Sequence, residues 1–286
     1  SDNQIGGADR RVVNGEYYRQ LRFRLRPYAC FGAGDHFASY LRMNWAWRDF
    51  SNIPARRKMA KFPDEFFVDN FYIQATNLFD GFLDLKIGRQ DYIPGSGRVI
   101  ADGTPGDGGR SYYFDMVKAT LHVTEKSALD LGLIDDHYRN PLDIGNAYSK
   151  WDLTSFGPGG AFHSDDYSKI DERAALAYYT DNRFDYFPFE LYWIWKQETR
   201  QWRFAGGART RYPGRQYQTL GTRLMPRLSD HVTTEFEFAG QVGTVEAQGD
   251  IASRDILAGM AYEGVTYDPR GWKEKPDYHF VPKTTL

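Results

Sequence analysis

The sequence has almost no cysteine and no long hydrophobic run. Its single cysteine, Cys30, excludes an intrachain disulfide and a cage of thiolate ligands around a metal ion. No run of about 18 apolar residues is present, and the mean hydropathy is −0.62, which excludes a helical membrane protein. A membrane β-barrel stays open, because its lipid-facing and lumen-facing residues alternate and cancel in a hydropathy window.

The chain also lacks an excess of charge of one sign. Its 36 basic and 38 acidic side chains give a formal net charge of −2, whereas a nucleic-acid-binding protein is normally basic. Nucleic acid is therefore not an expected partner. No nucleophile elbow, His-Glu-x-x-His segment or pair of cysteines is present, so we expect no enzymatic activity, catalytic residue, bound metal or cofactor.

Strict alternation of apolar and polar residues is present along most of the chain. Within 82–123, for example, Leu83 and Ile87 share one face of an expected strand, while Asp84 and Lys86 lie on the other. About twelve strands of this kind are predicted. They lie within 16–28, 37–48, 65–76, 82–91, 113–124, 129–133, 171–180, 187–196, 202–211, 220–228, 232–242 and 256–262.

Short turns alternate with longer loops between these strands. The Gly- and Asp-containing segment 32–35 and the segment 125–127 are typical of hairpin turns. By contrast, we expect loops at the basic segment 55–61 and at 138–168, where no periodicity is visible. A loop as long as the second counts against a compact soluble domain but is common in membrane barrels. In 65–76, Phe67 and Phe71 are expected on one face, with a bulge or strand end at Asp69.

Three features favour a membrane barrel over a soluble β-sandwich. The expected strands have the length of about ten residues that a tilted strand needs to cross a bilayer. Their polar faces mix Arg, Lys, Asp, Glu and Gln, as a water-filled lumen would. Large aromatic residues are also expected near strand ends, at Tyr17, Tyr18, Trp45, Trp47, Tyr112, Tyr113, Trp193, Trp195 and Trp202. The sequence therefore predicts an all-β fold, an antiparallel up-and-down transmembrane β-barrel.

Several short motifs carry a resemblance to a known family. They are Gly88-Arg89-Gln90, Arg98, the Gly- and Asp-rich arc 102–109, Arg110, Phe114-Asp115, the segment 259–264, and Gly271-Trp272-Lys273. In these motifs the chain resembles the bacterial alginate-export family of outer-membrane proteins. The resemblance implies one outer-membrane barrel domain over 1–286 and a location in the bacterial outer membrane.

Two features depart from that family. Its barrel is eighteen-stranded, whereas about twelve strands are expected here. The segment 282–286 also ends the sequence without a terminal aromatic strand. Either a C-terminal part of the barrel is missing or the barrel is smaller, and the sequence leaves both open.

Arginines on the polar faces are the candidate substrate-binding residues. A column of guanidinium groups would bind the carboxylates of a polyanion. The alternative is that they pair with acids on neighbouring strands, such as Glu190, Glu235 and Glu237, and hold the lumen together. The candidates are Arg22, Arg24, Arg26, Arg42, Arg89, Arg98, Arg110, Arg203, Arg209 and Arg223.

The resemblance singles out Arg89, Arg98 and Arg110, since the loop that carries them can fold inward and narrow or gate the pore. The arc 102–109 within it lacks the spacing of an EF-hand, which favours a solvated turn over a calcium site. We expect a channel for diffusion or export of an anionic, alginate-like polysaccharide or oligosaccharide. That saccharide, outer-membrane lipid and periplasmic export proteins are the expected partners. The alternatives are a general porin for small polar solutes and a soluble β-rich polysaccharide lyase or binding module.

Overall fold

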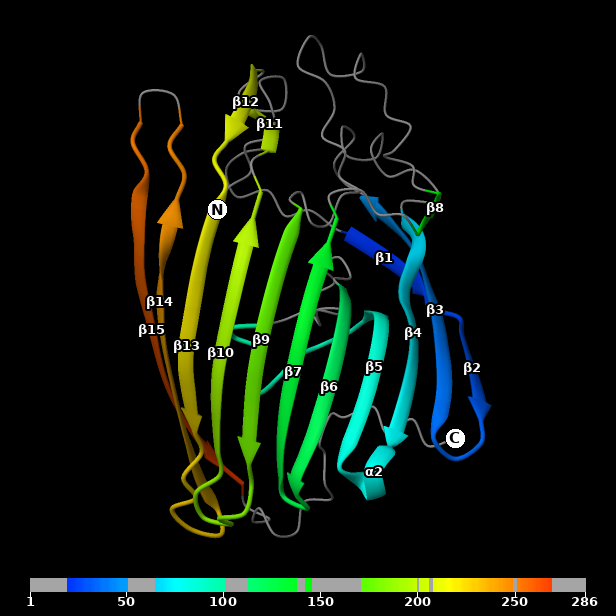
Figure 1. The fold of residues 1–286 in the computed structure, drawn as a ribbon, viewed down its shortest axis with the longest axis vertical. Helices are drawn as coiled ribbons and strands as arrows, with labels where there is room; N and C mark the ends of the chain where they lie inside the picture. Colours follow the sequence, from blue (N-terminus) through cyan, green and yellow to red (C-terminus); the bar gives the residue numbers. More distant parts are fainter. Residues whose placement is uncertain are drawn as a thin grey trace.

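The computed structural model describes residues 20–50, 65–100, 113–137, 142–145, 171–199, 201–205, 208–248 and 251–268. Most of them form one curved antiparallel sheet (Figure 1). Among these residues, no helix is long and apolar enough to cross a membrane. The strands of the sheet are β1 (Gln20–Leu25), β2 (Tyr28–Ala33), β3 (Phe37–Phe50), β4 (Glu65–Asn77), β5 (Leu83–Gln90), β6 (Phe114–Thr124), β7 (Ser127–Asp136), β8 (Asp143–Gly145), β9 (Glu172–Asp181), β10 (Phe189–Glu198), β13 (Arg215–Leu224), β14 (Val232–Val245) and β15 (Arg254–Tyr267).

The sheet has the up-and-down order that the alternating pattern predicted. The order of the strands in the sheet is β1-β3-β4-β5-β6-β7-β9-β10-β13-β14-β15. Each strand in this order is hydrogen-bonded to its neighbours, and the order follows the chain. Both β1 and β2 pair with β3, along different parts of its length. Pro27 lies in the break between them, where its missing N–H costs no ladder hydrogen bond. Within the described residues, β15 and the β1–β2 pair are the two edges of the sheet, and no hydrogen-bonded ladder joins them.

The two ends of the sheet differ in the length of their connections. The hairpins β2–β3, β6–β7, β9–β10 and β13–β14 all turn at the lower end in Figure 1, as does the β4–β5 connection through α2 (Leu78–Gly81). In that connection Asn77, Phe79 and Asp80 adopt positive φ angles, so the chain reverses within a few residues. The strand ends that flank the longer connections lie at the opposite end, in agreement with the predicted alternation of turns and loops.

A bulge in β4 corrects one sequence prediction. The register between β3 and β4 shifts where Arg42 faces Asn70 and Met43 faces Val68, so Asp69 is the extra residue. A bulge or a strand end was expected at Asp69. The prediction that Phe67 and Phe71 share a face is wrong, because the extra residue moves Phe67 to the opposite face. Phe67 is 1% exposed, whereas Phe71 is 53% exposed.

Three further expectations need correction. The expected loop 138–168 contains the short strand β8, which pairs with β4. The strands β11 (Gln201–Ala205) and β12 (Ala208–Tyr212) form a separate two-stranded hairpin outside the main sheet. Trp193, expected at a strand end, lies near the middle of β10. The expected basic loop 55–61 lies outside the described residues.

The two faces of the sheet have opposite character. One, here called the outer face, presents large apolar side chains to the surroundings: Phe23, Leu25, Phe71, Ile73, Ile87, Val117, Leu131, Leu133, Leu191, Leu220, Phe238, Val242, Leu257 and Val265. The other, the inner face, carries most of the charged residues of the strands together with a buried cluster. That cluster consists of Tyr92, Met116, Ile134, Leu176, Tyr178, Tyr192 and Ile194. The packed core therefore lies on the polar side of the sheet, not on its apolar side.

Candidate functional site

The segment 91–100, which follows β5, lies across the inner face and is here called the inner loop. In Figure 1 it is the thin teal trace that passes behind β7, β9 and β10. Its side chains contact strands that are far away in the sequence. The Tyr92 hydroxyl donates to Asp130 on β7 at 3.1 Å, and the Ser96 hydroxyl donates to Glu237 on β14 at 2.6 Å. The expected inward fold of this loop is therefore observed for its described part.

Arg98 is the main anchor of the inner loop. Its guanidinium donates to Glu237 at 3.1 Å and also pairs with Glu235. The guanidinium carbon lies 3.3 Å from the centre of the Tyr262 ring on β15, a cation–π contact. The hydrogen bond to Glu235 raises the pKa of Arg98 above its ordinary value, so the anchor stays charged.

Gly95 allows the loop to approach the sheet closely. Its φ of +58° favours glycine, and a Cβ atom there would lie 2.2 Å from the Tyr178 hydroxyl and 2.5 Å from a Glu190 carboxylate oxygen.

Burial raises the pKa of the Tyr92 hydroxyl far above its usual range, and the charge of Asp130 acts in the same direction. Tyr92 is therefore a permanent hydrogen-bond donor at the base of the loop.

The carboxylates that hold Arg98 belong to a wider ion-pair network. Arg223 donates to Glu235 at 2.9 Å and to Glu190 at 3.1 Å, so acids and arginines alternate from β10 across β13 to β14. The Tyr178 hydroxyl donates to Glu190 at 2.6 Å. Such a connected set of charge-assisted hydrogen bonds makes the attachment of the loop cooperative.

A second network joins β3, β4 and the segment after β1. Asp69, which is fully buried, accepts hydrogen bonds from Arg26 at 2.8 Å and from Arg42 at 2.9 Å. Arg42 also pairs with Asp91, the first residue of the inner loop, at 2.8 Å. Asn70 donates to the same Asp91 carboxylate at 2.9 Å. The bulge in β4 thus turns a carboxylate toward two guanidinium groups.

Arg89 lies in a closed environment. Its side chain is 1% exposed and donates to both oxygens of Asp115 at 2.8 Å and to the Val68 carbonyl at 3.0 Å. The guanidinium also lies 3.7 Å from the centre of the Tyr113 ring. Arg89 therefore holds β4, β5 and β6 together, and its predicted role in binding a substrate stays a prediction.

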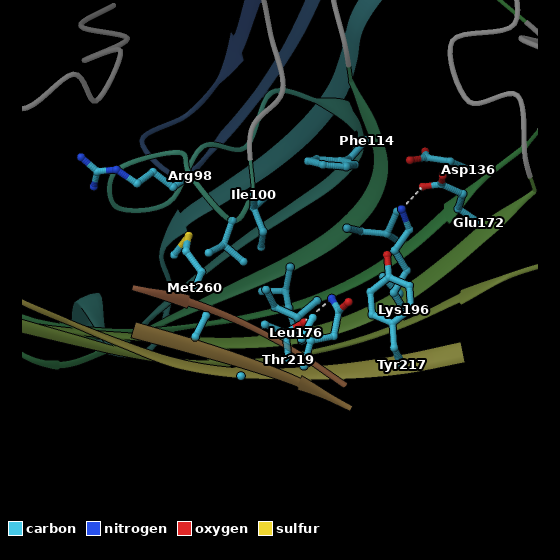
Figure 2. Close-up of a pocket in the computed structure, with 18 of the residues that line it drawn as sticks. Arg98, Ile100, Phe114, Asp136, Glu172, Leu176, Lys196, Tyr217, Thr219 and Met260 are labelled. Carbon is cyan, nitrogen blue, oxygen red and sulfur yellow. Dashed lines mark hydrogen bonds and ion pairs between the residues drawn. The ribbon is translucent and has the colours of Figure 1, made fainter. Parts of the chain in front are cut away.

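A cavity of about 560 Å³ lies between the inner loop and the sheet (Figure 2). Its centre is apolar, and its lining includes Ile100, Leu176 and Met260. One end is polar and is formed by Asp136, Glu172, Lys196 and Tyr217, with the Lys196 ammonium 2.8 Å from Glu172. The arrangement resembles a small-molecule site, with an apolar body and a few convergent polar groups.

The predicted arginines divide into three groups. Those whose side chains are placed and paired with carboxylates are Arg26, Arg42, Arg89, Arg98 and Arg223. Arg24 is half-buried on β1, opposite Ala46 of β3. Arg22 on β1, and Arg203 and Arg209 on the separate β11–β12 hairpin, have side chains outside the described part, and Arg110 and the arc 102–109 lie outside it entirely. The alternative prediction, that the arginines pair with acids on neighbouring elements, therefore holds for the five paired arginines.

Sequence reasoning missed the residues that build the cavity. Ile134, Leu176 and Ile194 are apolar residues on faces that otherwise carry charge, so the alternation pattern concealed them. Ser96 and Tyr262 gave no local signal, because their roles depend on a loop that docks more than a hundred residues away in the chain. A search for apolar residues on the charged face of each strand could have found Ile134, Leu176 and Ile194.

Comparisons with known proteins assign no family. No family model and no curated protein matches the chain. Among solved structures, a high-pH structure of Pseudomonas putida OprB matches with a TM-score of 0.37 and 13% identity, covering 87% of this chain and 76% of that one. At this similarity the match carries no weight for function. The resemblance to the alginate-export family is not confirmed.

Proposed function

We propose that this chain forms the wall of an outer-membrane channel for polar solutes, narrowed by the inner loop. The observation that carries the proposal is the inversion of the two faces. The outer face exposes large apolar side chains along nearly every strand, while the inner face buries charged and hydrogen-bonded groups. In water this arrangement would expose far more contiguous apolar surface than a soluble protein tolerates, whereas in lipid it is the stable one.

A band of exposed aromatic residues supports the same placement. It gathers at the end of the sheet with the short turns, the lower end in Figure 1. Aromatic girdles of this kind lie at the level of the lipid headgroups in membrane barrels. The exposed aromatic residues at this end are Phe31, Phe37, Phe79, Phe82, Phe184, Tyr186, Phe187 and Tyr267.

The proposal requires the sheet to close. Within the described residues β15 and the β1–β2 pair are edges, and in hydrocarbon an unpaired backbone group costs several kcal/mol. Closure therefore has to come from residues outside the described ranges or from further strands. A closed barrel would enclose the inner face, the inner loop and both ion-pair networks in its lumen.

The charges of the inner face favour the passage of polar solutes without a preference for anions. The placed arginines of the inner face and the inner loop, such as Arg42, Arg98 and Arg223, are neutralised by carboxylates. An anionic, alginate-like saccharide is the finer proposal, and it rests on the family resemblance alone. It would require guanidinium groups that exchange their present carboxylate partners for those of the solute.

Liposome swelling tests both the channel and its preference for an anionic saccharide. Vesicles that contain the full-length chain should swell in neutral and in acidic sugars of equal size at similar rates. A clear preference for the acidic sugar would support the finer proposal. Impermeable vesicles, together with a protein that stays soluble without detergent, would contradict the channel itself and favour a soluble β-rich protein.

A further inference from the structure

The cavity beside the inner loop differs from the rest of the inner face, because its floor is apolar. Ile134, Leu176 and Ile194 from three adjacent strands form that floor, and Val99 and Ile100 cover it from the loop. An apolar floor contributes nothing to the passage of hydrated solutes. It does bind the apolar part of an organic molecule, and a volume of about 560 Å³ suits one of modest size.

The polar end of the cavity carries one carboxyl group without a counter-ion. Asp136 is 5% exposed and accepts a hydrogen bond from the Asp115 backbone N–H at 2.7 Å. In the part of the chain that the structure describes, no cationic side chain forms an ion pair with Asp136. Burial in this state favours the neutral form of the carboxyl group, and a cation from outside the protein would stabilise its charged form.

The nearby ammonium group is already occupied. Lys196 lies 2.8 Å from Glu172 and 3.2 Å from Glu198, so two carboxylates neutralise it. Figure 2 shows Asp136 beside Glu172, with Lys196 reaching toward Glu172. Arg215 also pairs with Glu198, so Glu172 and Glu198 are balanced by two cations. The ionised form of Asp136 then gives the polar end one excess negative charge, which attracts a cationic group and repels a carboxylate.

We propose that this cavity binds an amphipathic organic amine. The apolar body of the amine lies on the floor formed by Ile134, Leu176 and Ile194, and its ammonium group pairs with Asp136. The proposal concerns a ligand site in the folded chain and does not depend on whether the protein conducts solutes.

Three probes of similar size and different head groups test the proposal. Calorimetry on the full-length chain in non-ionic detergent compares 2-phenylethylamine, 2-phenylethanol and 3-phenylpropanoate. We expect the amine to bind about tenfold or more tightly than the alcohol, a difference of about 1.4 kcal/mol, and the carboxylate not to bind. Titration of each probe into detergent without protein gives the heat of its partition into micelles, which is subtracted for that probe.

Three variants locate the site. Asp136→Asn should reduce the affinity for the amine to that for the alcohol. Ala258→Phe places a ring in the cavity from an exposed position on its lining, and it should abolish binding of both probes. Asp84→Asn removes the same charge from the inner face outside the cavity, and should leave both affinities unchanged. Circular dichroism checks that each variant is folded.

Equal affinity for the three probes, or an amine preference that persists in Asp136→Asn, would overturn the proposal. Absence of amine binding to the folded wild-type chain would overturn it as well. Failure of the protein to conduct solutes would contradict the channel function while leaving these binding results intact, so the two failures are distinguishable.

Discussion

Arg98 and Glu237 are 139 positions apart in the chain, and their side chains form an ion pair at 3.1 Å. The pair joins the inner loop, which follows β5, to β14 on the far side of the sheet. Glu235 and the Tyr262 ring hold the same guanidinium, so Arg98 is the main attachment of the loop to β14 and β15.

Arg98→Gln should loosen the inner loop. The variant loses the ion pairs with Glu235 and Glu237 and the cation–π contact with Tyr262, so we expect a higher single-channel conductance with more current noise. Planar-bilayer recordings measure both. Arg173→Gln is the matched control, since it removes the same charge from an exposed pair with Asp135 outside the loop. Identical recordings from the two variants would mean that the loop does not narrow the passage.

Asp69→Asn should destabilise the protein strongly. Asp69 is fully buried and pairs with Arg26 and Arg42, so its loss leaves Arg26 without a carboxylate and Arg42 with Asp91 alone, at a cost of roughly 3 kcal/mol. Urea unfolding, followed by tryptophan fluorescence, gives the change in the free energy of unfolding. The control Asp185→Asn breaks the exposed pair with Lys126 and should cost less than about 1 kcal/mol. A mild effect at Asp69 would show that the network contributes little.

Leu220→Arg tests the outer face. Leu220 is 63% exposed in the middle of β13, where a lipid-facing arginine costs roughly 2–4 kcal/mol. We expect the variant to refold poorly into lipid vesicles. Leu228→Arg is the control, because Leu228 is 68% exposed in the turn after β13, at the level of the headgroups. Equal refolding of both variants would argue against burial of β13 in lipid.

Gly88→Ala should be poorly tolerated. Gly88 has a φ of +122°, and a Cβ atom there would lie 2.3 Å from the Phe71 carbonyl oxygen, a backbone atom that cannot move aside. We expect a loss of roughly 3 kcal/mol or more in the free energy of unfolding. Gly34→Ala has positive φ but open space around it, and should cost about 1 kcal/mol. Equal losses would mean that β4 and β5 do not approach each other this closely.

The strands could be predicted because their signal is local. Leu83 and Ile87 share the outer face as their spacing predicted, and the turn before Ser127 ends β6 as expected. Phe67 could not be assigned correctly, because the bulge at Asp69 reverses its face. The guanidinium groups that hold Asp69 come from residues 43 and 27 positions away, which no local pattern indicates.

The candidate site was predicted less completely than the strands. One of the two predictions for the arginines was pairing with acids such as Glu190 and Glu235, and both of these pair with Arg223 from neighbouring strands. The partners of Arg98 depend on how the inner loop crosses the sheet, which is a property of the tertiary fold. The cavity depends on the same crossing, because Val99 and Ile100 cover its floor.

The most direct test of the proposed function is the conductance of a planar lipid bilayer after addition of the purified, folded, full-length chain. We predict stepwise increases in current and a reversal potential in a salt gradient that shows only weak selectivity between cations and anions. A folded preparation that inserts into the bilayer without producing current steps would contradict the proposal.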